Sequence, residues 1–228
     1  MSLLALIPAR GGSKGILRKN IKTLFDKPLI NWTINAAKQA KCIDRIVVST
    51  DDLEIAEIAK KCGAEVPFLR PSELATDETP GIEPALHAIE KIPGFDWLIL
   101  LQPTSPLRTA SDIDGIFNFC QKQLASSVVS VCEVSKHPYL MYQMDKSLNL
   151  QPLISNRPEI TRRQDFPNVY SLNGALYLAR VDWLIKNRSF IGVDTLGFTM
   201  PLEKSIDLDT ALDWSMAEQI LKMNNHGS

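Results

Sequence analysis

The chain has 228 residues, of which 45% are hydrophobic and 22% are charged, and its formal net charge is −1. This length and composition can form a sizeable core, so we expect one folded domain over 1–228 and exclude a disordered chain. The near-zero charge argues against a general nucleic-acid or anionic-membrane surface. No apolar run approaches the about 20 residues that span a bilayer, and no signal peptide is visible, so we expect a cytoplasmic protein.

A glycine-rich, basic loop follows the first predicted strand. An apolar run over 3–7 stops at Pro8, and the loop over 9–20 then contains three glycines. Backbone N–H groups in such a loop can form an anion-binding nest, because glycine permits the φ values that aim them inward. The loop lacks the Walker and dinucleotide fingerprints, and a two-glycine turn is often a plain connector. Its four cations nevertheless favour a triphosphate cradle; they are Arg10, Lys14, Arg18 and Lys19.

Strands and helices alternate in the first half of the chain. Apolar spacing predicts helices over 28–40, 53–62 and 81–92, and strands over 45–50, 65–68 and 97–101. Strands that alternate with helices imply right-handed crossovers and a parallel sheet. Ligands of such sheets collect beyond the carboxyl ends of the strands, where the loop over 9–20, the segment 50–52 and Gln102 fall.

The alternation continues into the second half of the chain and then breaks. We expect helices over 111–123, 181–186 and 210–223, and strands over 127–134, 172–179 and 195–200. The segment 135–168 carries prolines, a polar middle and short apolar runs. It is long for a loop inside a compact domain, which predicts a functional lid or an extension.

Two aspartates stand just before the last predicted helix. Asp207 and Asp209 are two positions apart, so both carboxylates face one site if this piece is extended. Paired carboxylates beside a polyphosphate cradle suit Mg²⁺, which takes a few protein oxygens together with phosphate oxygens. The alternative is that Asp209 merely caps the last helix. Asp213, one turn into that helix, is expected to act on the helix dipole at the surface.

Other polar residues form a second candidate group. Gln102 follows an apolar strand, and its amide can bond a sugar-acid hydroxyl or a base edge, although the prolines beside it also suit a structural turn. Arg162 and Arg163 have forks that suit a carboxylate, although adjacent arginines on a loop are usually solvated. Asn173 and Tyr177 are evenly spaced on a predicted strand, so both can face one pocket.

Four ordered segments resemble the CMP-sialic acid synthetase (acylneuraminate cytidylyltransferase) family, which includes legionaminic- and pseudaminic-acid enzymes. They are IPARGGSKGILRKN over 7–20, LQPTSPLR over 101–108, RRQDFPNVYSLNGALY over 162–177 and SIDLDTALDW over 205–214. The resemblance implies a Rossmann-like, mostly parallel α/β sheet flanked by helices, of the nucleotide-diphospho-sugar transferase type. It also implies that the segment 135–168 is a protruding arm that reaches a neighbouring subunit in a homodimer.

The resemblance further implies an activity in cell-surface polysaccharide biosynthesis. CMP would pass from CTP to the anomeric hydroxyl of a nine-carbon 2-keto-3-deoxy sugar acid, with release of pyrophosphate and with Mg²⁺ as the cofactor. In this reaction Arg10, Lys14 and Lys19 would hold the triphosphate and stabilise the leaving pyrophosphate. Asp207 and Asp209 would hold the metal, and Asp209 would orient the attacking hydroxyl.

A set of binding residues follows from the motifs and the resemblance. The expected nucleotide-binding residues are Ala9, Arg10, Gly11, Gly12, Ser13, Lys14, Asn20, Arg70, Asp77 and Thr79. The expected acceptor-binding residues are Gln102, Arg108, Lys136, Arg162, Arg163, Asn173, Tyr177 and Phe190. Arg163, with or without Arg162, would act across the dimer. Lys136 and Phe190 can equally be arm surface and core.

One segment departs from the family pattern. Where the sialic-acid members usually carry serines soon after a Thr-Asp pair, this chain has Thr79, Pro80 and Gly81. A legionaminic- or pseudaminic-type acid is therefore as credible an acceptor as N-acetylneuraminate. Two rivals also stay open: a nucleotidyltransferase for another acceptor, such as the eight-carbon octulosonate or a sugar phosphate, and a non-catalytic nucleotide-binding protein. The aspartate pair and Lys14 argue against the second, because binding alone requires no metal carboxylates.

Overall fold

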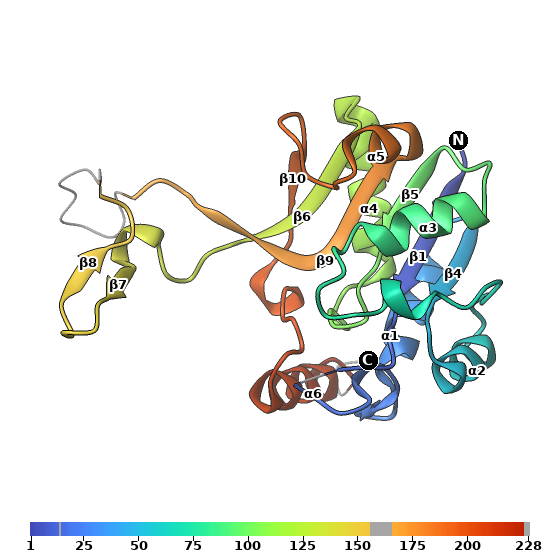
Figure 1. The fold of residues 1–228 in the computed structure, drawn as a ribbon, viewed down its shortest axis with the longest axis horizontal. Coiled ribbons are helices and arrows are strands. Elements are labelled where there is room, and N and C mark those ends of the chain that lie inside the picture. Colours follow the sequence, from blue (N-terminus) through green and yellow to red (C-terminus); the bar gives the residue numbers. More distant parts are fainter. Residues whose placement is uncertain (14, 156–165, 226–228) are drawn as a thin grey trace.

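A six-stranded sheet lies at the centre of the computed structural model, which describes residues 1–13, 15–155 and 166–225 (Figure 1). The strand order is β10-β6-β9-β5-β1-β4. The bounds are β1 Leu3–Pro8, β4 Arg45–Ser49, β5 Trp97–Leu100, β6 Ser127–Glu133, β9 Tyr170–Arg180 and β10 Leu196–Thr199. β1 is parallel to β4 and β5, and β10 is parallel to β6, whereas β9 runs antiparallel between β5 and β6. The predicted mostly parallel sheet is confirmed, with one reversed strand.

Helices cover both faces of the sheet (Figure 1). They are α1 Leu29–Gln39, α2 Leu53–Lys61, α3 Glu83–Lys91, α4 Ala110–Gln123 and α5 Val181–Asn187. The last helix, α6 Ala211–Asn225, packs in a third cluster that contains no residue of the six-stranded sheet. Leu3, Ala5 and Ile7 of β1 lie in one core cluster with residues of α1, α2 and α4. Leu4 and Leu6 lie in a second cluster with residues of α3 and α5. Successive residues of β1 are apolar because a strand covered on both faces has no solvent side.

The predicted elements match these bounds within a few residues, except for the strand expected over 65–68. There, Glu65 and Leu69 form isolated bridges with β4 and with the residue after it. Pro67 explains the difference, because proline offers no N–H to a ladder. Elsewhere, β2 Thr23–Leu24 and β3 Lys27–Pro28 form a short antiparallel pair before α1. Within the described ranges, no helix has the length and apolar character needed to cross a membrane.

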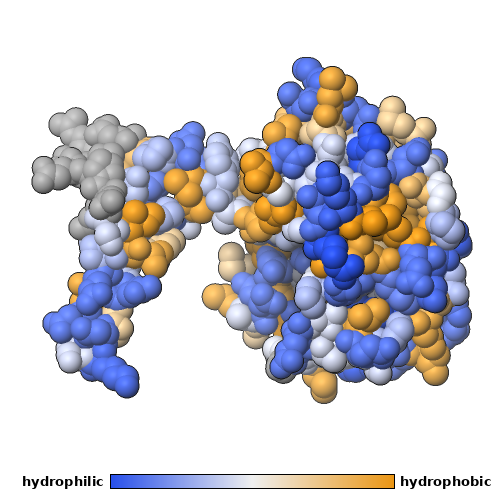
Figure 2. Space-filling view, turned by 45° about the horizontal axis from the view of Figure 1, so that its top comes forward, coloured by the Kyte–Doolittle hydropathy of each residue, from blue (hydrophilic) through white to orange (hydrophobic). Residues whose placement is uncertain are grey.

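The segment between β6 and β9 leaves the sheet and projects from the rest of the molecule (Figures 1 and 2). Within it, β7 Tyr142–Met144 pairs antiparallel with β8 Leu150–Pro152. Near its root, the His137 ring lies 4.5 Å from the Tyr139 ring and 4.7 Å from the Phe166 ring, centroid to centroid. These ring contacts stiffen the point where the extension leaves the sheet. Its contact with a neighbouring subunit stays a prediction.

β9 carries a bulge where it passes the carboxyl end of β5. Tyr177 pairs with Val129 of β6 and Leu172 pairs with Val131, so β9 has extra residues opposite a short stretch of β6. Within this bulge Gly174 has a φ of +72°, which glycine adopts without steric cost. The bulge breaks the alternation of side chains along β9, and this changes which of them reach the site.

Candidate active site

A cavity of about 500 Å³ opens at the carboxyl edge of the sheet, where β1 and β5 end. Four segments supply its walls: the loop after β1, the segment before α3, the turn after β5 and the stretch before α6. The lining residues are Pro8, Arg10, Gly12, Ser13, Gly15, Lys19, Asn20, Arg70, Asp77, Gln102, Pro103, Thr104, Asp207 and Asp209. Parallel α/β sheets bind their ligands at this edge, so the fold and the cavity indicate the same place. We call it the anion cavity.

The loop after β1 is held in one shape by side chains that bond its backbone. The N–H of Gly11 donates to Asp51 Oδ1 at 3.0 Å. Asn20 Nδ2 donates to the carbonyl of Arg10 at 2.9 Å. The Ser13 hydroxyl bonds two backbone groups further along the loop, at 2.6 and 3.2 Å. The loop is therefore preorganised, which lowers the entropy cost of ligand binding.

Two cations of the anion cavity are paired with carboxylates on its walls. Arg10 forms an ion pair with Asp77 at 2.5 Å. Lys19 Nζ donates to the carbonyl of Leu208 at 2.6 Å and to Asp209 Oδ1 at 3.0 Å. These pairs join the glycine-rich loop to two distant segments of the chain. They hold both cations at the cavity, where a polyphosphate can compete for them.

Arg70 is the most deeply buried cation of the cavity, with its side chain 4% exposed. Its Nε and Nη2 atoms have no hydrogen-bond acceptor within the part of the chain that the structure describes. The nearest ion-pair contact joins Nη2 to Asp51 Oδ1 at 3.9 Å. Burial lowers the pKa of the Arg70 guanidinium. A desolvated guanidinium with N–H groups to spare, on a cavity wall, suits an anionic ligand.

The cluster of four loop cations expected from the sequence is not what the structure shows. Arg18 forms ion pairs with Asp52 and Glu54 and does not line the anion cavity, so its expected place in the cradle is wrong. Arg18 instead ties the loop to the start of α2, since Asp52 is the N-cap residue of that helix. Lys14 lies outside the described residues.

Asp207 and Asp209 both line the anion cavity, as their spacing predicts. Desolvation raises the pKa of the Asp207 carboxyl, although a hydrogen bond from Thr104 acts in the opposite direction. Thr210 is the N-cap residue of α6: its Oγ1 accepts from the N–H of Asp213 at 3.3 Å, and Asp213 Oδ2 accepts in return from the N–H of Thr210 at 2.7 Å. The alternative that Asp209 serves as the helix cap is therefore wrong, and its carboxylate faces the cavity.

Two neighbouring carboxylates are what this cavity offers a metal ion. Among the described residues, no group of three or more His, Cys, Asp or Glu side chains could hold one. Mg²⁺ is usually bound by one or two carboxylates plus substrate phosphates rather than by a cage of protein ligands. The donor set of Asp207 and Asp209 therefore fits a Mg²⁺ ion that binds together with a polyphosphate.

A second cavity, of about 360 Å³, shares Gln102 with the anion cavity. Tyr177 and Phe190 line it with their ring centroids 5.6 Å apart. Burial raises the pKa of the Tyr177 hydroxyl. Pro80 and Gly81, from the segment that departs from the family pattern, lie on its wall. This adjoining cavity therefore suits a ligand with apolar groups that reaches the anion cavity past Gln102.

Sequence reasoning missed several residues that line these cavities, and two of them carry polar side chains at informative places. Arg188 lines the adjoining cavity and forms an ion pair with Glu83 of α3 at 2.6 Å. Arg188 is the C-cap residue of α5 and has a left-handed backbone conformation, with a φ of +48°. No motif in the sequence indicates this conformation. Thr104 lines the anion cavity, and its neighbours in the QPTSPLR segment could have indicated it.

Arg108 and Asn173 do not line either cavity, although the sequence placed both at the acceptor. The Arg108 residue is 3% exposed and donates to backbone carbonyls. The Asn173 amide bonds the hydroxyls of Ser130 at 2.5 Å and Ser205 at 2.9 Å. The even spacing misled because the bulge in β9 separates Asn173 from Tyr177. Both positions favour structural roles.

Four more expected residues lie off the cavity walls, and the first is Gly11, whose N–H donates to Asp51 Oδ1. Ala9 is buried, and its N–H donates to the carbonyl of Ser49 at 2.9 Å. Thr79 Oγ1 donates to the carbonyl of Glu73 at 3.2 Å on the surface. Lys136 is exposed near the root of the extension and lines neither cavity. The two arginines expected to cross the dimer, Arg162 and Arg163, lie outside the described residues.

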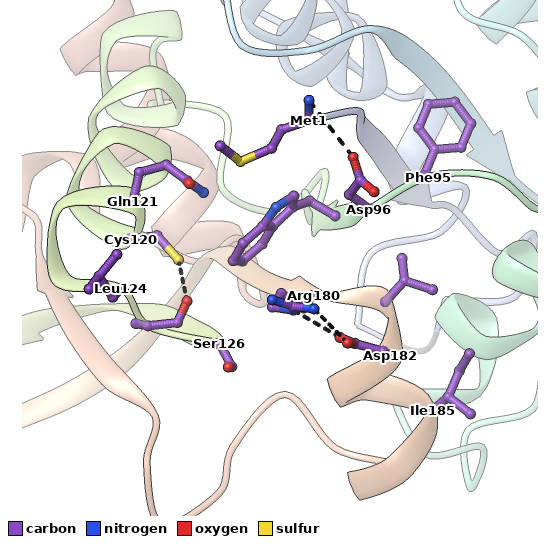
Figure 3. Close-up of a pocket in the computed structure, with 13 residues that line it drawn as sticks. Met1, Phe95, Asp96, Cys120, Gln121, Leu124, Ser126, Arg180, Asp182 and Ile185 are labelled. Carbon is purple, nitrogen blue, oxygen red and sulfur yellow. Dashed lines mark hydrogen bonds and ion pairs between the residues drawn. The ribbon is translucent and has the colours of Figure 1, made fainter.

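A larger cavity, of about 640 Å³, lies at the opposite edge of the sheet, where β1 and β5 begin and β9 ends (Figure 3). Its charged groups pair with one another. The N-terminal ammonium of Met1 lies 3.9 Å from Asp96, and Arg180 pairs with Asp182 at 2.7 Å. We call it the opposite cavity. It is larger than the anion cavity, so size alone does not identify the site.

Comparison with known proteins agrees with this geometry. Residues 4–203 match the model of a family described as cytidylyltransferase. The chain belongs to the cytidylyltransferase family. It is therefore an enzyme of the nucleotidyltransferase class, and the rival of a non-catalytic nucleotide-binding protein loses its support.

Relatives of this cytidylyltransferase share most of its length. It is 39% identical to the CMP-N,N'-diacetyllegionaminic acid synthase of Legionella pneumophila, with 98% of each chain covered. It is 33% identical to the N-acylneuraminate cytidylyltransferase of Escherichia coli O18:K1:H7, over 98% of this chain and 53% of that one. The CMP:2-keto-3-deoxy-manno-octonic acid synthetase complexed with CTP has the same fold, with a TM-score of 0.76, 15% identity, and coverage of 98% and 100%.

Proposed function

We propose that this cytidylyltransferase transfers CMP from CTP to the anomeric hydroxyl of a nine-carbon 2-keto-3-deoxy sugar acid and releases pyrophosphate. The acceptor is of the sialic, legionaminic or pseudaminic type. The full-length similarity to the legionaminic acid synthase of L. pneumophila carries the proposal. The two cavities support it, because one suits a triphosphate and the other a sugar acid, with Gln102 between them.

The cations of the anion cavity bind the triphosphate. Arg10, Lys19 and Arg70 converge from different segments, so they can contact several phosphate oxygens at once. Lys14, on the same loop, joins them. As the bond between the α-phosphorus and its bridging oxygen breaks, negative charge accumulates on the leaving pyrophosphate. Fixed cations stabilise that charge, since they need no reorganisation during the reaction.

Two carboxylates complete the site on the side of the acceptor. Asp207 and Asp209 hold Mg²⁺, which supplies Lewis-acid polarisation of the phosphate oxygens when it is bound. Asp209 also accepts a hydrogen bond from the anomeric hydroxyl and so aims its oxygen at the α-phosphorus. The new oxygen–phosphorus bond forms as the hydroxyl loses its proton to solvent and the bond from the α-phosphorus to the bridging oxygen breaks, with its electron pair leaving on pyrophosphate. Gln102 bonds the sugar acid at the boundary of the two cavities.

The protein is a cytoplasmic homodimer in which the extension over 135–168 contacts the partner subunit. Its β7–β8 hairpin exposes apolar side chains, which a partner subunit would cover; they include Tyr142, Met144, Leu148 and Leu150. Arg162 and Arg163 lie in the same segment of the chain, and their guanidinium groups suit the acceptor carboxylate of the partner's site.

The test is pyrophosphate release from CTP and Mg²⁺ with a panel of acceptors. The panel contains N,N'-diacetyllegionaminate, N-acetylneuraminate, pseudaminate and the eight-carbon octulosonate. We expect a strong signal with one nine-carbon acid. Turnover of the octulosonate alone would favour the second candidate, which the fold shared with the 2-keto-3-deoxy-manno-octonic acid synthetase supports. Silence with every acceptor, while CTP still binds, would contradict the proposal.

A further inference from the structure

We propose that Arg108 is a positioning residue: it fixes the turn after β5 against the bulge of β9, and thereby places Gln102 at the boundary of the two cavities and Asp207 on the wall of the anion cavity. The sequence had indicated a direct contact with the acceptor for this residue. The inference rests on the proposed function for its effect on turnover, but the geometry that it describes can be tested without any substrate.

The Arg108 guanidinium joins three elements inside the core. Nη1 donates to the carbonyl of Gln102 at 3.2 Å and to the carbonyl of Ala175, in the bulge of β9, at 2.6 Å. Nη2 donates to Thr33 Oγ1 of α1 at 2.6 Å. A planar fork spans three acceptors in fixed directions, which a lysine ammonium on a flexible chain does not reproduce. Arg108 therefore sets the distance between the turn, the bulge and α1.

The turn that Arg108 holds is bonded in its middle to the aspartate segment. The N–H of Leu208 donates to the carbonyl of Thr104 at 2.9 Å. The Thr104 side chain also interacts with the Asp207 carboxylate and favours its charged form, which acts against the rise of its pKa by burial. A shift of the turn would thus carry the carboxylate with it. The position of Asp207 depends on residues that are more than 90 positions away in the sequence.

The bulge approaches the same two side chains from the other direction. A Cβ on Gly174 would lie 2.8 Å from Gln102 Oε1 and 3.9 Å from Asp207 Oδ2, so the glycine backbone passes directly beside both groups. Asn173, the residue before it, bonds Ser205 Oγ at 2.9 Å, close to the aspartate segment. The bulge therefore lies directly against both side chains, and Arg108 bonds it through the carbonyl of Ala175.

A buried arginine is a costly way to build a core. Arg108 is 3% exposed, and no carboxylate forms an ion pair with it in the described ranges. Burial lowers the pKa of Arg108 to about 9, and its Nε has no hydrogen-bond acceptor among the described residues. Well-packed apolar residues are often as stabilising as buried charges. A role in placing the site explains why the charge is present.

The experiment compares two pairs of variants in the full-length protein. Arg108→Lys keeps the charge and removes the fork, and we expect kcat/KM for the sugar acid to fall about 100-fold. Thr33→Val removes the acceptor of Nη2 at nearly constant volume, at a residue that lines neither cavity, and should lower the same ratio about fivefold. Thr33→Ser keeps the hydroxyl and should restore it. KM for CTP should change less than about threefold throughout, because separate bonds hold the glycine-rich loop.

Hydrogen–deuterium exchange tests, without substrate, whether Arg108 holds the turn after β5 and the bulge of β9 in place. In Arg108→Lys we expect faster amide exchange over 102–105 and 173–176, with unchanged exchange in β1 and β4. Arg180→Lys, in the opposite cavity, is the matched control and should alter neither kinetics nor exchange.

If wild-type protein turns over none of the acceptors, the proposed function fails while the exchange data still decide this inference. Unchanged exchange in those segments overturns it. So does a loss of all kinetic parameters in proportion to the unfolded fraction. Should Arg108→Lys not fold, the Thr33 pair provides both measurements.

Discussion

The two ends of the central sheet each carry a cavity with charged walls, and they differ in how those charges are satisfied. In the opposite cavity, the paired side chains of Arg180 and Asp182 are 51% and 66% exposed (Figure 3). In the anion cavity, the side chains of Arg70 and Lys19 are 4% and 12% exposed. The Arg180–Asp182 pair is hydrated and local in sequence, whereas Arg70 and Lys19 are desolvated and face carboxylates of other segments.

Incompletely satisfied charge, rather than cavity volume, therefore distinguishes the carboxyl edge of the sheet from the opposite edge. A charge removed from water loses free energy unless hydrogen bonds or a counter-ion replace its hydration. In the anion cavity this replacement is incomplete, because Arg70 keeps two nitrogens without an acceptor among the described residues. An anionic ligand supplies the missing acceptors, so the site is most stable when it is occupied.

The largest expected effect comes from removing one carboxylate from each of the two cavities. We expect Asp209→Ala to lower kcat for pyrophosphate release by about 10³-fold or more, because it removes a metal ligand and the group that orients the attacking hydroxyl. Asp182→Ala removes a carboxylate from the opposite cavity and should leave kcat within about twofold of wild type. Both variants should show native circular dichroism. Near-normal turnover by Asp209→Ala would remove this residue from the mechanism.

The next effect separates binding from stability. Arg70→Met should raise KM for CTP by about 10- to 100-fold, the worth of one or two hydrogen bonds to a charged group. Its Tm should equal or exceed that of wild type, because the variant no longer buries an incompletely bonded guanidinium. Arg180→Met, at the opposite cavity, should change neither quantity. Kinetics and thermal denaturation measure both, and a lower Tm with an unchanged KM would show that Arg70 is structural.

Much of this comparison was predictable from the sequence. Alternating strands and helices placed the carboxyl edge of the sheet, and therefore the side of the molecule on which the site lies. The spacing of Asp207 and Asp209 correctly predicted that both face one cavity, although the N–H of Asp209 donates to the carbonyl of Asp207 at 3.1 Å, so the segment turns there instead of being extended. Local patterns succeed where the backbone is regular, because side-chain direction then follows from position alone.

The errors lie where tertiary contacts override local pattern. Arg18 looked like one of four loop cations, but Asp52 and Glu54 neutralise it, and no local rule connects residues so far apart. Asn173 and Tyr177 were placed on one face because the bulge of β9 leaves little trace in the sequence. Arg108 was placed at the acceptor through its motif, but its guanidinium is buried against Ala175 and Thr33, which lie far from it in the sequence.

A smaller effect tests how tightly the glycine-rich loop is fitted. A Cβ on Gly11 would lie 2.7 Å from Asp52 Oδ2, whereas a Cβ on Gly12 would meet nothing within 4 Å. Gly11→Ala should therefore lower the free energy of unfolding by about 1–2 kcal/mol. Gly12→Ala should leave stability unchanged and raise KM for CTP, because its methyl group enters the anion cavity. Urea denaturation and kinetics distinguish the two, and equal stability of both variants would contradict a close-fitted loop.

The smallest expected effect is the pH dependence of stability that Asp52 and Asp182 each contribute. The Arg18 guanidinium lowers the pKa of Asp52 below its ordinary value of 3.8, and Arg180 lowers that of Asp182 in the same way. A carboxyl with a lowered pKa in the folded state stabilises the protein above about pH 4, and this stability is lost as the pH falls through the folded-state pKa. The Asp52 side chain is 19% exposed and also caps α2, so its contribution should be about 1 kcal/mol. The Asp182 pair is largely hydrated, so its contribution should be smaller and should vanish in high salt.

Urea denaturation at about pH 7 and about pH 3 measures both contributions. Wild type should lose more stability between these pH values than Asp52→Asn does, and Asp182→Asn should follow wild type closely. Asparagine is itself a good N-cap residue, so Asp52→Asn removes the titration and the ion pair while the helix stays capped. An equal change in the two variants would mean that the carboxyl edge of the sheet holds its charges no more tightly than the opposite edge.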